Sequence, residues 1–220
     1  MNRRTFLTVA AGAGCVALAG CTSDSGPEEL DDVDGDGDGV GVDPDEFPRP
    51  ALGSGPVTVD VYEDLACPFC HQFEAQVFPS IESDLIDTGE ITYRYFDFPI
   101  PVDEDRSVDM ANAARAVQAE TYTDDEPAGD LFAYKAAVFR TSDWSDSNLV
   151  ALAEDVGVDG DAVASALEEG TYYPVIEADR SAAVDRGVTG TPTVFVEDER
   201  IEASSLQGMY DGIVETVESN

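Results

Sequence analysis

Two cysteines at the junction between a strand and a helix constrain this chain more than any other feature. The segment VTVDVYE alternates Val57, Val59 and Val61 with polar or aromatic residues, which is typical of a β-strand. The cysteines follow in CPFC at residues 67–70, and apolar residues then recur at helical spacing until Gly89. The sequence therefore predicts a strand, a cysteine pair and a helix, with the pair at the helix N-terminus.

This position gives the two cysteines different chemistry. The i, i+3 spacing places both sulfurs on one face of the first helical turn, close enough for a disulfide. Pro68 suits the first helical position, where its missing N–H costs nothing. Free backbone N–H groups and the helix dipole stabilise a thiolate on Cys67 and lower its pKa. Cys70 lies one turn further in and suits the role of the thiol that resolves a mixed disulfide.

Other uses of the pair fit less well. A closed structural zinc site takes four ligands, and the folded part offers only Cys67, Cys70 and His71 of the soft or imidazole type. An inert disulfide would close a very small loop and gain little stability. We expect redox chemistry and no metal site. The alternatives are a copper(I)-binding lipoprotein that uses the two thiolates, and a peptide- or solute-binding lipoprotein with an inert disulfide.

The net charge restricts both partners and source. The 220 residues include 47 acidic and 11 basic ones, and the formal charge is -36. So few basic residues cannot neutralise phosphates, which excludes nucleic acid as a partner. At about 1 M salt the Debye length is about 3 Å, so a dense acidic surface repels itself little. The composition favours a halophilic source, and we expect a halophilic archaeon.

The first 21 residues are typical of an export signal. Arg3 and Arg4 precede a weakly apolar run that is shorter than the roughly 20 residues of a membrane span, and they resemble a twin-arginine signal. The run ends in LAGC, which resembles a lipoprotein processing site and would leave a lipid on Cys21. We expect an extracytoplasmic protein, anchored by this lipid to the outer face of the cell membrane. Ordinary cleavage before Gly20 would instead release a secreted protein.

Residues 22–55 read as an acidic flexible linker. Ser, Asp, Glu, Gly and Pro dominate this stretch, and its apolar residues are isolated. Residues 32–43 partly match a calcium-binding loop, but Asp43 stands where that loop has Glu, and Pro44 blocks a following helix. A solvated tether is the favoured interpretation.

A second motif lies far downstream. The stretch RGVTGTPTVFVEDERI at residues 186–201 predicts a helix end at Gly187, a tight loop with Thr191 and Pro192, and two strands. With CPFC, this GTPT motif resembles the DsbA-like branch of the thioredoxin superfamily. The resemblance covers residues 54–220. It implies an α/β thioredoxin fold over residues 56–220, with a helical insertion at about 103–187. Periodicity predicts helices there at 108–120, 130–140, 148–156, 162–169 and 174–187.

The resemblance also implies an active site and partners. In that family the proline is cis beside the redox-active disulfide, and the residue before it offers its backbone to the client. It thus implies catalytic roles for Cys67, Cys70, Thr191 and Pro192. Clients would be proteins with cysteine pairs, a separate redox partner would recycle the CPFC pair, and no dissociable cofactor is needed. The direction of electron flow stays open.

One position departs from the family pattern. Relatives often carry a buried acid six residues before the first cysteine, where it assists proton transfer. Here that position is Val61. Asp60 and Asp64 are the neighbouring acids, and the sequence leaves open whether either of them moves a proton.

We predict that Cys21→Ser moves the protein from the membrane to the soluble fraction, because the lipid has no other attachment point. Fractionation of cells that express each variant measures this. Cys15→Ser serves as the control, since Cys15 lies inside the signal and is removed in either case. Continued membrane attachment of the Cys21 variant would contradict the lipoprotein assignment.

Overall fold

The computed structural model describes residues 42–100 and 104–220. The predicted export signal, Cys21 and most of the predicted linker lie outside these ranges. Within them, no helix is both long enough and apolar enough to cross a membrane.

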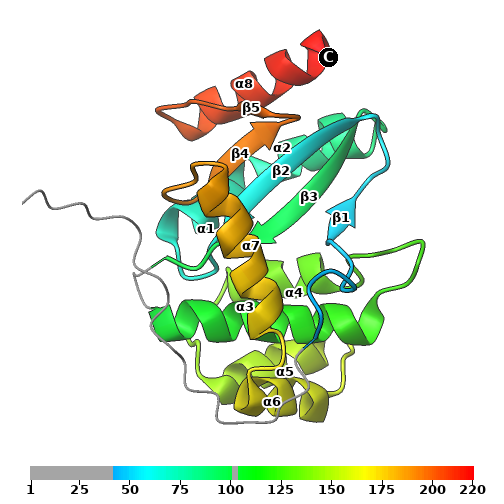
Figure 1. Cartoon of the computed structure of the whole chain (residues 1–220), viewed down its shortest axis with the longest axis vertical. Helices are drawn as coiled ribbons and strands as arrows, with labels where there is room; N and C mark the ends of the chain where they lie inside the picture. The colour runs from blue at the N-terminus through cyan, green and yellow to red at the C-terminus, as the bar shows by residue number, and fades with distance from the viewer. Residues whose placement is uncertain (1–41, 101–103) are drawn as a thin grey trace, which may run out of the picture. The chain divides into compact units, whose positions relative to one another are not determined.

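A mixed five-stranded sheet lies at the centre of the fold, in the order β1-β3-β2-β4-β5 (Figure 1). Its strands are β1 (Ala51–Leu52), β2 (Val57–Glu63), β3 (Ile91–Asp97), β4 (Thr193–Val196) and β5 (Glu199–Arg200). β2 and β3 are parallel, and the other neighbours are antiparallel. The strand predicted from VTVDVYE is therefore the central one, and it is buried from Val59 onward.

Helices cover both faces of this sheet. On one face lie α1 (Pro68–Gln76), α2 (Phe78–Ile81), the π-helical turn η1 (Glu82–Ile86) and α8 (Leu206–Ser219). Valines of β2 and β4 pack there against Phe73, Ile81 and Ile213. On the other face lies α7 (Tyr173–Asp185) (Figure 1). Its Ala183 packs against an aromatic layer that includes Tyr62.

The single helix predicted between the cysteines and Gly89 is instead broken. α1 ends at Gln76, and α2 restarts with Pro79 in its first turn. Proline has no N–H to donate to the preceding turn, so the ladder of hydrogen bonds is interrupted there. The apolar spacing survives the break, because Phe73, Ile81 and Leu85 all face the same core.

Four helices form the insertion between β3 and α7. They are α3 (Glu104–Thr121), α4 (Leu131–Val138), α5 (Asp146–Asp155) and α6 (Gly160–Glu169). Their small and apolar side chains form a separate core. α6 begins two residues earlier than its predicted start, because the carboxylate of Asp159 caps it by accepting from the N–H of Asp161. The predicted thioredoxin-type α/β fold with a helical insertion is confirmed.

Residues 42–55 differ from the linker that the sequence predicted. β1 pairs with the edge of β3, and the Pro50 carbonyl accepts from the N–H of Tyr95. Arg49 forms an ion pair with buried Asp179 at 2.5 Å. Phe47 packs its ring against Tyr172. These contacts are isolated along the chain and leave no periodic pattern, so the sequence did not indicate them.

Candidate active site

The two cysteines lie where β2 passes into α1. Cys67 is the N-cap residue of α1 with extended backbone angles (φ -75°, ψ 121°), and Pro68 occupies the first turn. Cys70 follows within the same turn. Both are free thiols, with relative exposures of only 2% and 0%. The structure thus places the pair at the helix N-terminus, as the sequence predicted.

Hydrogen bonds make Cys67 the more acidic thiol. The bond from the Cys70 thiol is the largest influence, and the resulting pKa of Cys67 is about 5. A contact with Thr191 and the backbone N–H groups of Cys70 and Phe69 lower the pKa further, while burial opposes them. A pKa of about 5 favours the thiolate form of Cys67 at neutral pH.

Cys70 has the opposite character. Burial raises the pKa of its thiol well above the ordinary value, and the hydrogen bond to Cys67 and the negative charge of Glu63 raise it further. Cys70 therefore keeps its proton when Cys67 has lost its own. Because a thiolate is the attacking species in exchange, this difference makes Cys67 better suited to attack than Cys70.

The fold brings the second motif, with Thr191 and Pro192, next to the cysteine pair. The Thr191-Pro192 peptide bond is cis, immediately before β4. The Cys67 sulfur lies 3.5 Å from the Thr191 carbonyl oxygen, across 124 residues of sequence, and donates to it when the thiol is protonated. The hydroxyl of Thr193 closes the loop by donating to the Gly190 carbonyl at 2.6 Å. All four residues predicted for the site are brought together.

A buried charge cluster that the sequence did not reveal lies behind Cys70. Glu63, at the end of β2, accepts from the ammonium of Lys135 in α4 at 2.5 Å. Lys135 also pairs with Glu74 of α1 at 3.0 Å. The side chains of Glu63 and Lys135 are fully buried, whereas that of Glu74 is 12% exposed. The cluster therefore runs from the interior towards solvent.

The acid within this cluster titrates near neutral pH. Burial raises the pKa of Glu63 to about 7, against the opposing charge of Lys135. Its oxygen Oε1 has no hydrogen-bond partner among the described residues. A buried carboxyl with a free oxygen and a pKa near 7 is suited to accept a proton from a neighbouring group.

Two signals in the sequence could have indicated this cluster. Residues 61 and 63 share one face of a strand, so an acid at Glu63 can replace the family's acid at the position of Val61. Lys135 is the only lysine in the chain, and a lone lysine in an arginine-using protein is unusual. The sequence could not show that the two meet, because 72 residues separate them.

The two acids considered from the sequence lie in different environments. Asp60 binds Arg94 through both of its oxygens, at 2.6 and 2.9 Å, and also binds Arg186 at 2.6 Å. These arginines engage both oxygens of its carboxylate. Asp64 is buried in the turn directly before Cys67 and remains beside the site.

The single histidine has a structural partner. The Nε2 atom of His71 lies 2.9 Å from the Leu65 carbonyl, and its ring contacts Phe139 and Trp144 of the insertion. Across residues 42–100 and 104–220, no group of three or more His, Cys, Asp or Glu side chains is arranged to hold a metal.

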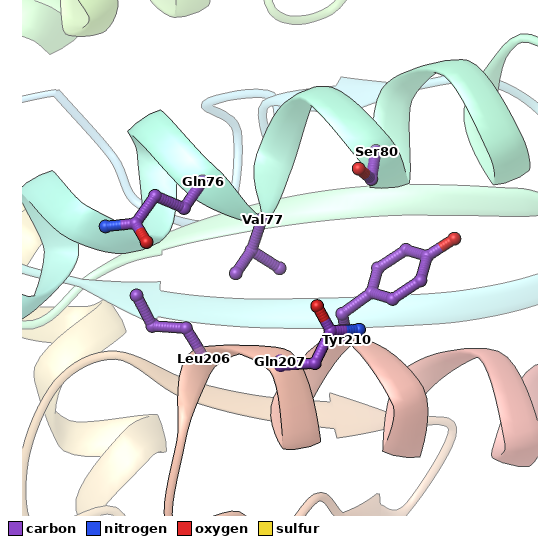
Figure 2. Close-up of a pocket in the computed structure, with 6 residues that line it drawn as sticks. All are labelled: Gln76, Val77, Ser80, Leu206, Gln207 and Tyr210. Carbon is purple, nitrogen blue, oxygen red and sulfur yellow. The ribbon is translucent and has the colours of Figure 1, made fainter.

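A surface pocket lies away from the cysteines, between α1–α2 and the start of α8 (Figure 2). Its lining is mainly polar and contains none of the site residues: Gln76, Val77, Ser80, Leu206, Gln207 and Tyr210. Nothing in this lining suggests chemistry linked to the sulfurs.

Comparisons with known proteins agree with this geometry. A family model described as thioredoxin matches residues 53–215. Disulfide bond formation protein D of Bacillus subtilis (strain 168) is 25% identical over 179 residues, which cover 77% of this chain and 76% of that protein. The crystal structure of oxidised BdbD from Bacillus subtilis is similar with a TM-score of 0.67 at 24% identity, over 78% of this chain and 91% of that one. Chlamydia trachomatis DsbA has a TM-score of 0.65 at 19% identity, over 78% and 92% of the two chains.

We predict that only Cys67 of the reduced protein reacts rapidly with iodoacetamide near pH 6, because its pKa of about 5 makes it a thiolate there. Cys70 should react far more slowly, since it is buried and protonated. Mass spectrometry of peptides after short exposures locates the label. Equal slow labelling of both sulfurs would contradict the described electrostatics.

Proposed function

This chain belongs to the thioredoxin family, whose family model matches residues 53–215, and we propose that it is an exported, membrane-tethered thiol–disulfide oxidoreductase. One observation carries the proposal: an acidic Cys67 thiol at a helix N-terminus, next to a buried, protonated Cys70 and the cis Pro192. The similarity to a disulfide bond formation protein supports the same reaction class.

The exchange proceeds through a mixed disulfide. In the reducing direction the Cys67 thiolate attacks a client disulfide, bonds to one client sulfur and releases the other as a thiolate. Cys70 then gives up its proton and attacks the sulfur of Cys67. This forms the Cys67–Cys70 disulfide and releases the second client thiolate. The reverse sequence oxidises a client dithiol, and a separate redox partner restores the starting state of the pair.

Glu63 is proposed to accept the proton of Cys70. The charge of Glu63 acts on the Cys70 sulfur, and the oxygen Oε1 is free to take a proton. Lys135 keeps Glu63 partly ionised despite its burial, and Glu74 extends the charge cluster towards solvent. A carboxyl with a pKa of about 7 can gain and lose a proton in each cycle without a large cost.

Client proteins would lie across the loop of Thr191 and the exposed side of α1. Phe69, between the two cysteines, is 64% exposed and offers an apolar surface beside Cys67. The backbone of Thr191 would pair with an extended client segment, as in strand addition to a sheet edge. Such a contact recognises the backbone of the client rather than its side chains, so it suits many clients with cysteine pairs.

The proposed site of action is the outer face of the cell membrane of a halophile, reached by twin-arginine export and held by a lipid on Cys21. Disulfides persist in oxidising compartments outside the cytoplasm, which suits an enzyme that exchanges them. The acidic composition, with a formal charge of -36, supports a salt-rich medium.

We predict that Cys70→Ser traps clients as mixed disulfides on Cys67, because the resolving thiol is missing. Cys67→Ser should trap none and should lose all turnover. Insulin reduction and the oxidation of a dithiol peptide measure activity, and non-reducing gels show the adducts. If the wild type shows no disulfide exchange and instead binds copper(I) tightly and stoichiometrically, the result would favour a copper-handling lipoprotein.

We predict that Glu63→Gln slows the resolution of mixed disulfides at pH 7 by roughly a hundredfold, at the lower end of general-base contributions. Lys135 retains Glu74 as a partner in this variant, so its charge stays compensated. Stopped-flow release of a fluorescent client peptide measures the rate. Tyr93→Phe is the matched control, because it alters a buried hydroxyl near the same acids without removing a carboxyl. Equal rates in both variants would remove Glu63 from the mechanism.

A further inference from the structure

The buried Asp64 side chain holds together three segments next to Cys67 by hydrogen bonds. Its Oδ1 atom accepts from the N–H of Ala66 at 2.8 Å, and its Oδ2 atom accepts from the N–H of Ile100 at 3.0 Å and the hydroxyl of Ser107 at 3.0 Å. Its backbone carbonyl also accepts from the N–H of Cys67 at 3.0 Å. One residue thus joins the turn that carries the nucleophile to the segment after β3 and to α3.

These contacts favour a negative charge on Asp64, close to a second one. Three donors on two oxygens fit an ionised carboxylate, whereas a protonated carboxyl accepts fewer bonds. The residue is only 2% exposed, so water screens its charge weakly. The nearby Cys67 is also negative once the pair is reduced, and its charge acts on Asp64. Reduction therefore sets two like charges against each other inside the protein.

The titratable groups near Asp64 have partners of their own and do not neutralise the repulsion between Asp64 and the Cys67 thiolate. Glu63, the preceding residue in the chain, is bound by Lys135. His71 of α1 is bound to the Leu65 carbonyl through Nε2. α3 faces Asp64 with the neutral Ser107, and the segment after β3 faces it with a backbone N–H.

We propose that Asp64 is a positioning residue that links proton uptake to the redox state of the Cys67–Cys70 pair. The inference rests on the thiol–disulfide exchange proposed above. Reduction of the disulfide by a client dithiol or glutathione adds two electrons, which yield the Cys67 thiolate and, with one proton, the Cys70 thiol. The new thiolate raises the proton affinity of Asp64, so near pH 6 a larger fraction of Asp64 takes a proton from solvent in the reduced state. Oxidation removes the thiolate, and Asp64 returns that proton.

The coupling has a definite sign. Burial raises the pKa of Asp64 to about 6, and its hydrogen bonds oppose that rise. Above about pH 6 its negative charge disfavours the Cys67 thiolate, so it stabilises the disulfide and weakens the protein as an oxidant. Below that pH Asp64 is neutral and the effect disappears. Asp64 would therefore moderate oxidising strength in a pH-dependent manner.

The test compares the wild-type chain with Asp64→Asn. The equilibrium constant with glutathione is measured from about pH 5 to about pH 8. Asparagine removes the charge, and its amide can still bond to Ala66 and Ser107. At about pH 8 we expect the variant to be more oxidising by about tenfold, equivalent to one pKa unit on Cys67. The difference should shrink towards none near pH 5.

A matched control and a direct readout separate charge from structure. Ser107→Ala removes one donor and keeps the carboxylate, so at pH 8 it should behave as the wild type. Reduced-minus-oxidised infrared spectra near pH 6 should show a protonated carboxyl band on reduction in the wild type and lose it in Asp64→Asn. A shift of equal size at every pH, or a wild-type spectrum without that band, would overturn the inference.

The two proposals fail in different ways. If the wild-type pair does not exchange with glutathione at all, the proposed function is wrong. If it exchanges normally but shows no carboxyl band, only the role of Asp64 is wrong. The same infrared measurement on Glu63→Gln removes the other carboxyl that titrates near neutral pH, so a band that persists in this variant belongs to Asp64 even if the Asp64 variant folds poorly.

Discussion

The antiparallel pairing of β2 with β4 determines where the groups of the site lie. In its register Tyr62 stands opposite Thr193, so the loop with Thr191 and Pro192 meets the chain as it leaves β2. The same strand pairs on its other side with β3 in parallel. β2 is therefore held from both sides, and the turn after it carries the Cys67 N-cap at a defined place. The acidity of the nucleophile depends on that placement, because its donors come from α1 and from the loop before β4.

Buried charge is the second organising feature. A chain with 47 acidic residues exposes most of them, yet it buries a few carboxylates beside its scarce cations. Arg115 of α3 bonds to Asp97 of β3 at 2.6 Å and to Asp179 of α7 at 2.7 Å, which fastens the insertion to the sheet. Removal of one partner from such a network leaves an uncompensated buried charge, which destabilises a fold by about 3–5 kcal/mol. Lys135 likewise compensates the buried charges of Glu63 and Glu74, and it lowers the proton affinity of Glu63.

Local patterns predicted much of the fold. Alternating valines identified the central strand, and Pro68 with the cysteine spacing identified the start of α1. Boundaries were less accurate where a single residue decides them, as at the break before Pro79. The short strand β1 escaped prediction, because two residues carry no periodicity and their partner lies more than 40 residues along the chain. Asp64 was noticed in the sequence, but its three bonds depend on residues up to 43 positions away.

The sequence by itself determined the chemistry of the pair. CPFC after a strand specifies a helix N-terminus, and this position alone separates the two thiols by their access to backbone donors and the helix dipole. Only the tertiary structure decided which acids lie near that pair. Glu63, Lys135 and Glu74 come from a strand and two helices, and a pKa depends on burial and on charges a few ångströms away rather than on neighbours in the chain. Proximity of that kind arises from packing, so the order of the residues predicts the cysteine pair but not the buried charged groups that lie near it.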